Sequence, residues 1–183
     1  VMLQELAHFW PDTLRPQLAD ERIHIIDAAD YTDDDREYLG RHFNEHVCPV
    51  LTPLAFDPGH PFPLVSNRSK NLAVVVEHKG RTKFARVKVP DLVPRFVALP
   101  RDEGIRRYAM LEDVIRENLS QLFPGVGIRT AHMFRVVRDM EVAVTHPQDT
   151  PETILEVVDR GLREQQRGPV SLLEVEHGMP SRV

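Results

Sequence analysis

The stretch NLAVVVEHKGRTKFARVKVP, residues 71–90, decides the fold. Its two halves, 71–79 and 82–90, are rich in β-branched residues and meet at Gly80, which is typical of two antiparallel strands joined by a tight turn. Residues 72–76 are apolar at every position. A strand that is apolar on both faces belongs in the middle of a sheet. We therefore expect a β-hairpin whose first strand is central.

An extended, proline-rich segment precedes the hairpin. Five prolines fall within residues 49–63. Each proline lacks a backbone N–H donor and restricts the residue before it to extended geometry. Apolar residues stand between them, so the segment has side chains to bury and differs from a flexible linker. We expect an ordered connection that buries Val50, Leu51, Leu54, Phe56, Phe62 and Leu64.

Further strands and helices are interleaved irregularly with the hairpin. Apolar runs and alternation predict strands at 22–27, 95–100, 133–144 and 170–175. Apolar residues at helical spacing predict helices at 2–10 (ended by Pro11), 33–47, 111–123 and 151–167. This order predicts an α+β fold, with a mixed, mostly antiparallel sheet packed with helices. Residues 1–20 are expected to be an N-terminal helical appendage, and residues 21–183 the main domain.

The bulk composition is that of a folded globular domain. Of the 183 residues, 42% are hydrophobic and 28% are charged. No apolar run approaches the roughly 18–20 residues of a membrane span, and no secretory signal pattern is present. The single cysteine, Cys48, forms no intrachain disulfide, which fits a reducing compartment such as the cytoplasm. Because the chain starts at Val1 and stops at Val183 directly after a strand, we expect it to be part of a longer protein.

The net charge of −5 hides a basic region. Residues 68–107 contain eleven Lys or Arg against four Asp or Glu. Arg86 and Lys88 share one face of the second hairpin strand, with Arg81 and Lys83 nearby. A basic region in an acidic chain suggests contact with a polyanion or an acidic partner. The alternative is a solvated hairpin whose charges bind nothing.

Arg138 lies on the otherwise apolar face of the strand predicted at 133–144. A buried arginine must be paired, so one interpretation is an internal ion pair with Asp or Glu of a neighbouring element. The functional interpretation is that Arg138 and Arg135 face an interdomain cleft and hold phosphate, because a guanidinium fork suits phosphate oxygens. Arg138, Arg135, Arg86 and Lys88 are therefore the candidate substrate-binding residues.

Three histidines are candidates for chemistry, and each has a plainer interpretation. His42 and His46 have the i, i+4 spacing of two metal ligands on a helix, but the motif HFNEH lacks a third ligand. We interpret them as surface or interface residues. For His60, we favour a role in a turn or an interface over that of phosphoacceptor. No catalytic residues and no metal site are predicted, because no Gly-rich phosphate loop, Ser/His/Asp set or paired-carboxylate motif stands out.

Four stretches in register carry a family resemblance. They are CPVLTPLAFDPGHPFPLVSNRSKNLAVVV, VKVPDLVPRFVALP, LEDVIRENLSQLFPG and MFRVVRDMEV. Together they resemble the middle, or head, domain of bacterial polyphosphate kinase, of the type that builds long polyphosphate from ATP. The resemblance covers about residues 20–180, and residues 1–20 are similar in position to the end of that family's N-terminal helical domain.

The resemblance implies a division of labour. In that family the terminal phosphate of ATP moves reversibly onto polyphosphate through a phosphohistidine. The phosphohistidine, the Mg²⁺ site and most ATP contacts belong to two C-terminal domains similar to phospholipase D. The middle domain is associated with dimerisation. This implies a structural segment without the catalytic histidine or a cofactor of its own, inside a cytoplasmic, possibly membrane-peripheral, homo-oligomer that binds no nucleic acid.

Two other functions are compatible with the residues. The basic region suggests an independent module that binds a polyanion such as polyphosphate. A self-contained phosphohistidine or metal enzyme would have to use His42, His46 or His60, and its site would be incomplete. Prolines lower the entropy of the unfolded chain, so the proline-rich segment fits a stiff junction in a domain that positions others.

Overall fold

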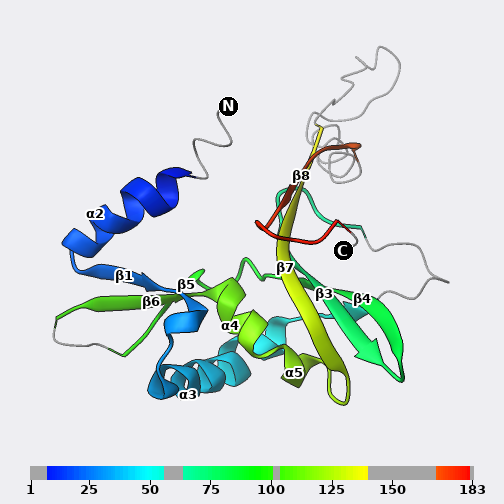
Figure 1. The fold of residues 1–183 in the computed structure, drawn as a ribbon, viewed down its shortest axis with the longest axis horizontal. Coiled ribbons are helices and arrows are strands. Elements are labelled where there is room, and N and C mark those ends of the chain that lie inside the picture. The colour runs from blue at the N-terminus through cyan, green and yellow to red at the C-terminus, as the bar shows by residue number, and fades with distance from the viewer. Residues whose placement is uncertain (1–7, 56–63, 101–103, 140–167, 182–183) are drawn as a thin grey trace, which may run out of the picture. The chain divides into compact units, whose positions relative to one another are not determined.

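The computed structural model describes residues 8–55, 64–100, 104–139 and 168–181 (Figure 1). The chain forms two compact units, and each unit is built from two separate segments. The first unit comprises Val1–Leu51 and Val89–Pro124, and the second comprises Thr52–Lys88 and Gly125–Val183. None of the helices in the described part of the chain has the length and hydropathy that a bilayer crossing requires. The expected boundary at residue 20 stays a prediction.

The first unit begins with helical chain that contains two prolines. The π-helical turn η1 (Trp10–Leu14) leads directly into α2 (Arg15–Asp20). Pro11 lies in the first turn of η1, and Pro16 lies in the first turn of α2. The helical chain runs through both prolines, and the Arg15 N–H donates to the Trp10 carbonyl between them, so the expectation that Pro11 ends a helix is wrong.

A capping box starts the helix α3 (Asp33–His42). The Asp35 N–H donates to Thr32 Oγ1 at 3.1 Å, and the Thr32 N–H donates to Asp35 Oδ2 at 3.1 Å. The π-helical turn η3 (Phe43–Val47) and the short 3₁₀ turn η4 (Cys48–Val50) continue the helix, so the prediction of a helix at 33–47 is confirmed. Its buried stripe comprises Leu39, Phe43 and Val47.

The sheet of the first unit has three strands in the order β1-β6-β5. β1 (Ile23–Ile26) pairs in parallel with β6 (Arg106–Met110), and β5 (Phe96–Ala98) pairs with β6 in antiparallel fashion. The predicted strands at 22–27 and 95–100 are thus confirmed. β6 was not expected, because RRYAM is short and carries two arginines. A 3₁₀ turn, η2 (Ala28–Asp30), follows β1.

The helix predicted at 111–123 is divided at Asn118. α4 (Leu111–Glu117) ends there, and α5 (Leu119–Leu122) begins directly afterwards. The Asn118 side-chain amide donates to the Val114 carbonyl at 2.8 Å. Such local side-chain hydrogen bonds compete with the helical ladder, which explains the break at this residue.

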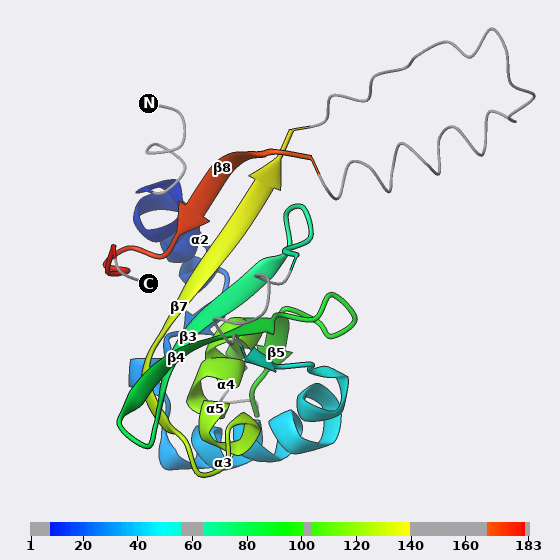
Figure 2. The ribbon, with the colours of Figure 1, turned by 90° about the vertical axis from the view of Figure 1, so that its right-hand side faces the viewer.

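The second unit is a five-stranded sheet with the order β2-β4-β3-β7-β8 (Figure 2). Every neighbouring pair in it is antiparallel. The hairpin of β3 and β4 is confirmed, and β3 is central. β7 begins six residues before the strand predicted at 133–144, of which residues 140–144 lie outside the described residues, as does the helix predicted at 151–167. The strands are β2 (Leu54–Ala55), β3 (Lys70–His78), β4 (Arg81–Lys88), β7 (Gly127–Arg138) and β8 (Val170–Val175).

The register of this sheet sorts its side chains onto two faces, because directly opposed residues of paired strands share a face. The face that we call the arginine face carries Ala73, Arg86, Phe134, Val136 and Arg138. The opposite face, the valine face, carries Leu72, Val74, Val76, Ala85 and Val87, all buried. A core cluster on the arginine face joins Val65, Ala73, Phe134 and Val136, with Phe84 and Met179 packed against it. With the parallel pair in the first unit, the fold is α+β and mostly antiparallel, as predicted.

Candidate functional site

Two arginines of the second unit bind the residues that follow the proline-rich segment, Leu64 and Val65. On β4, Arg86 Nη1 donates to the Leu64 carbonyl at 2.9 Å. On β7, Arg138 Nε donates to the Val65 carbonyl at 3.1 Å, and Nη1 donates to the Gly168 carbonyl at 2.7 Å. Both arginines lie on the arginine face, on strands separated by β3. Two adjacent residues of one segment are therefore fixed from two strands.

The turn that leads from this segment into β3 is also fixed to β7. The Arg138 N–H donates to Asn67 Oδ1 at 2.9 Å, and the Arg68 N–H donates to the Val136 carbonyl at 2.8 Å. Arg68 has a φ of +58°, a left-handed conformation that few non-glycine residues adopt. These contacts join residues some 70 positions apart in the sequence, so the turn belongs to the sheet.

The observed partners of Arg138 and Arg86 are backbone carbonyls. Among the described residues, Arg138 does not form the internal ion pair that was expected; it binds carbonyls instead. Arg86 is 9% exposed, and burial lowers the pKa of its guanidinium. Within the described part of the chain, its Nε is buried without a hydrogen-bond partner. A phosphate bound by these groups would therefore compete with the contacts that attach residues 64–65 to the sheet.

Arg135 lies on the valine face, away from Arg138 on the same strand. It stands opposite Glu174 of β8 and donates a hydrogen bond from Nε to that carboxylate. This hydrogen bond raises the pKa of Arg135 and lowers the pKa of Glu174. The sequence interpretation of Arg135 and Arg138 as one phosphate fork requires a shared face, and the register places them on opposite faces.

Lys88, the last residue of β4, is partly exposed and lies opposite Asn71 of β3. It shares the arginine face with Arg86. The structure therefore brings three of the four candidate residues, Arg86, Lys88 and Arg138, onto one sheet face and leaves Arg135 on the other. The sequence carries no signal that marks Leu64, Val65 and Asn67 as partners of these arginines, and they were not predicted.

The histidine pair of the first unit is stacked. The ring centroids of His42 and His46 lie 4.9 Å apart with an interplanar angle of 16°, and Tyr38 stacks on His42 at 6.4 Å. Burial and the neighbouring His46 lower the pKa of His42. Among the described residues, no group of three His, Cys, Asp or Glu side chains is placed to hold a metal ion. His60 lies outside the described residues, and Cys48 is half-buried.

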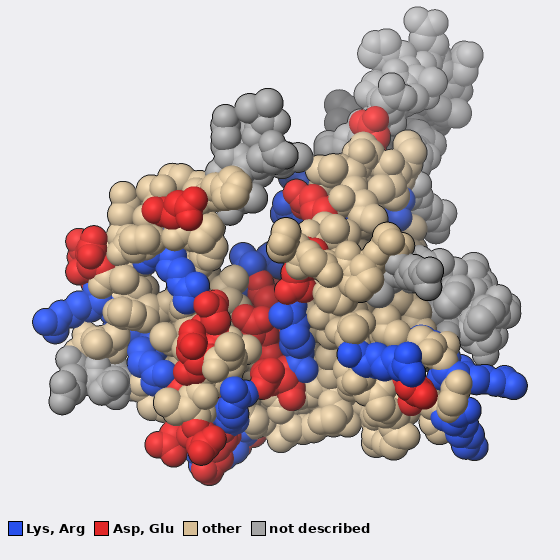
Figure 3. Space-filling model, in the orientation of Figure 1, with Lys and Arg blue, Asp and Glu red and all other residues tan. Residues whose placement is uncertain are grey.

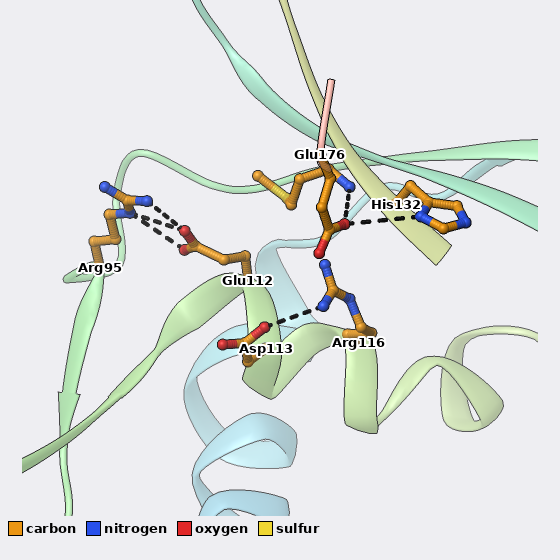
Figure 4. Close-up of polar contacts among 7 residues, drawn as sticks. Arg95, Glu112, Asp113, Arg116, His132 and Glu176 are labelled. Carbon is orange, nitrogen blue, oxygen red and sulfur yellow. Dashed lines mark hydrogen bonds and ion pairs between the residues drawn. The ribbon is translucent and has the colours of Figure 1, made fainter. Parts of the chain in front are cut away.

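Two arginines of the basic region, Arg95 and Arg107, are neutralised by acidic partners in the first unit. Arg95 binds Glu112 through three hydrogen bonds of 2.5 to 3.3 Å (Figure 4). Arg107 binds Asp35 through two, at 2.6 and 3.0 Å. In the second unit, the carboxylate of Glu77 accepts from Arg129 Nε at 2.6 Å. The basic region of the sequence is therefore not one basic surface.

A second carboxylate contact lies in the second unit. Glu176 Oε2 accepts from the Met133 N–H at 2.8 Å and lies 4.0 Å from His132 Nδ1 (Figure 4). The Glu176 N–H in turn donates to the Met133 carbonyl at 2.8 Å. These bonds extend the pairing of β7 beyond the end of β8.

The fold places the chain in the class of α+β domains. Its two sheets lie in two units, whose segments alternate along the sequence. A family model described as the polyphosphate kinase middle domain matches residues 34–183. The chain is 44% identical over 94% of its length to the polyphosphate kinase of Mycolicibacterium gilvum, and 41% identical over 93% to that of Synechocystis. The chain belongs to the polyphosphate kinase family.

A solved structure supports the same assignment. The crystal structure of the polyphosphate kinase from Porphyromonas gingivalis matches 70% of this chain with a TM-score of 0.64 and 29% sequence identity, over 22% of its own chain. The chain likewise spans about a quarter of the length of the two relatives above, 24% and 25%. The match is to one domain of a longer enzyme.

The contacts of Arg138 predict a measurable loss of stability. We expect Arg138→Gln to lower the free energy of unfolding by about 2 kcal/mol, because two charge-assisted hydrogen bonds to carbonyls are lost. Urea unfolding of the 183-residue chain measures the change. The matched control is Arg135→Gln on the same strand, whose half-exposed ion pair contributes at most about 1 kcal/mol. Equal losses in the two variants would contradict the structural role of Arg138.

Proposed function

We propose that this chain is the structural middle domain of an enzyme that reversibly transfers the terminal phosphate of ATP to polyphosphate. It positions the other domains and contributes contacts to a homo-oligomer, and the catalytic histidine lies elsewhere in the enzyme. ATP and Mg²⁺ bind to those other domains, and the enzyme works in the cytoplasm. The similarity to polyphosphate kinases over a quarter of their length supports this proposal.

One structural observation carries the proposal: the arginines that are candidates for phosphate binding contact the chain itself. Arg86 and Arg138 bind carbonyls, and Arg135 binds Glu174. Side chains used in this way attach residues 64–65 to the sheet and join β7 to β8. Phosphate binding by Arg138, Arg135, Arg86 and Lys88 stays a prediction that these contacts do not favour.

An activity assay tests the proposal. The 183-residue chain is incubated with ATP, Mg²⁺ and a polyphosphate primer, and the full-length Mycolicibacterium gilvum enzyme is the positive control. We expect no polyphosphate synthesis and no phosphorylation of the chain, because the phosphohistidine is expected outside it. Polyphosphate formation, or incorporation of labelled phosphate into a histidine, would show that the reactive group lies within these residues.

A further inference from the structure

We propose that the tip of the β3–β4 hairpin binds inorganic polyphosphate through Lys79, Arg81 and Lys83. This inference rests on the proposed function, because it takes polyphosphate as the substrate of the enzyme. Of the basic residues in 68–107, the proposed site uses only these three. It also assigns to the domain a direct contact with the substrate, in addition to its structural role.

The three cations of the tip are exposed and uncompensated by nearby carboxylates. All three side chains are exposed. In the described part of the chain, none of them forms an ion pair or a side-chain hydrogen bond. The one carboxylate of the tip, Glu77, is neutralised by Arg129. The tip therefore keeps its positive charge, whereas Arg95 and Arg107 of the same basic region are paired with carboxylates.

The turn of the hairpin carries one of the three cations. His78 pairs with Arg81 and Val76 with Lys83, so the strands are paired up to the two-residue turn of Lys79 and Gly80. These two residues have φ of +50° and +72°, as a type I′ turn requires. Asn, Asp or Gly commonly takes the first of these positions, and here it is a lysine. The turn therefore places a lysine, and its charge, at the end of the hairpin.

The three charges are regularly spaced along the hairpin. Arg81 and Lys83 lie two residues apart on one strand face, about 7 Å along the strand. With Lys79 at the turn, the three cations extend from the turn along the start of β4. Figure 3 shows blue side chains gathered at this end of the hairpin, at the lower right, with little red among them. A linear array of this kind suits a linear polyanion, which presents a negative charge at every unit and needs no enclosed pocket.

Direct binding to long-chain polyphosphate tests the proposal. A labelled polyphosphate is titrated with the 183-residue chain, without ATP, at several salt concentrations. In the test variant, Lys79→Asn, Arg81→Gln and Lys83→Gln are combined, and the asparagine preserves the turn. We expect at least a tenfold loss of affinity at low salt. We also expect the slope of log affinity against log salt to fall by about 2, since each phosphate contact to a flexible strand contributes about 0.7.

A matched control distinguishes the effect of the tip residues on affinity from the effect of net charge. Arg22, Arg41 and Arg106 are exposed arginines of the first unit. Their combined change to glutamine removes the same three charges and is expected to change the affinity by less than about twofold. A variant that keeps the charges, Arg81→Lys with Lys83→Arg, is expected to bind as the unchanged chain does. Equal losses in the tip and control variants, or no binding by the unchanged chain at low salt, would overturn the proposal.

Competition distinguishes the source of the phosphate groups. ATP and tripolyphosphate carry the same chemistry as the polymer but engage fewer cations at once. We expect both to displace the labelled polymer only at concentrations far above that of unlabelled long-chain polyphosphate, counted per phosphate. Equal potency of ATP would assign the tip to nucleotides instead. The binding experiment involves no catalysis, so a failure to bind polyphosphate would overturn only the proposed site at the tip and leave the proposed function standing. Polyphosphate synthesis by the chain would contradict only the proposed function.

Discussion

Asp35→Asn is expected to lower the free energy of unfolding of this chain by about 3–5 kcal/mol, the cost of leaving a buried ion without its partner. The Asp35 side chain is 3% exposed and that of Arg107 is 19% exposed. The carboxylate accepts both hydrogen bonds of the Arg107 fork and also the N–H of Thr32. One side chain therefore joins the start of α3 to β6, two elements that are more than 70 residues apart.

A double-mutant cycle isolates this pair. Arg107→Met leaves the Asp35 carboxylate unpaired and is expected to destabilise the chain by a similar amount. The double variant Asp35→Asn with Arg107→Met is expected to lose less than the sum of the two changes, because no unpaired charge remains. The matched control is Asp34→Asn in the same helical turn, which is exposed and contributes at most about 1 kcal/mol. Additive losses in the cycle would contradict the coupling.

The same residue gives the chain a defined pH dependence. Burial works against the charged carboxylate, but the hydrogen bonds from Arg107 and Thr32 outweigh it and lower the pKa of Asp35 below its ordinary value of 3.8. A lowered carboxyl pKa stabilises the folded state fully above the unfolded value, and the stabilisation is lost as the pH falls through the folded value. Urea unfolding from pH 7 to pH 2 should therefore show the difference between the unchanged chain and Asp35→Asn shrinking below about pH 4.

Phe43→Ala is expected to cost about 3–5 kcal/mol in the free energy of unfolding, the range for a truncated core aromatic. Phe43 is fully buried at the start of η3, and Val47 at its other end is also fully buried. Thermal and urea unfolding measure the loss. The control is Phe9→Ala, which removes the same ring from a site that is 49% exposed and is expected to cost less than about 1 kcal/mol. A small loss at Phe43 would show that this turn does not contribute to the core.

The hairpin was predictable because two local signals agree there: the β-branched runs and the glycine between them. The helix at 33–47 was predictable for a similar reason, since its cap and its apolar stripe are both local in the sequence. The interruption at Asn118 was not, because asparagine also occurs within helices. β6 was missed because its burial depends on partners far away in the sequence, and its own five residues lack a periodic pattern.

The candidate site was predictable only in part. Arg138 stood out as a charge on an apolar face, and that anomaly is real. Its acceptors could not be predicted, because they are backbone carbonyls, one of them 73 residues earlier, and no side chain marks a carbonyl as an acceptor. The basic region was misleading for a related reason. It is continuous in the sequence, but its residues are divided between two units at Lys88 and Val89.

The interleaving of the two units constrains how the chain acquires its structure during synthesis. β1 emerges from the ribosome about 80 residues before its partner β6, and β7 needs β3 from more than 50 residues earlier. The first unit is complete only after Thr52–Lys88 of the second has been translated, and the second only after Val89–Pro124 of the first, so the nascent chain carries unsatisfied strand edges for a long interval. Ending the chain after Pro124 would keep both segments of the first unit but remove β7 and β8 from the second. A continuous piece of the chain that holds either unit complete must therefore also carry a segment of the other unit.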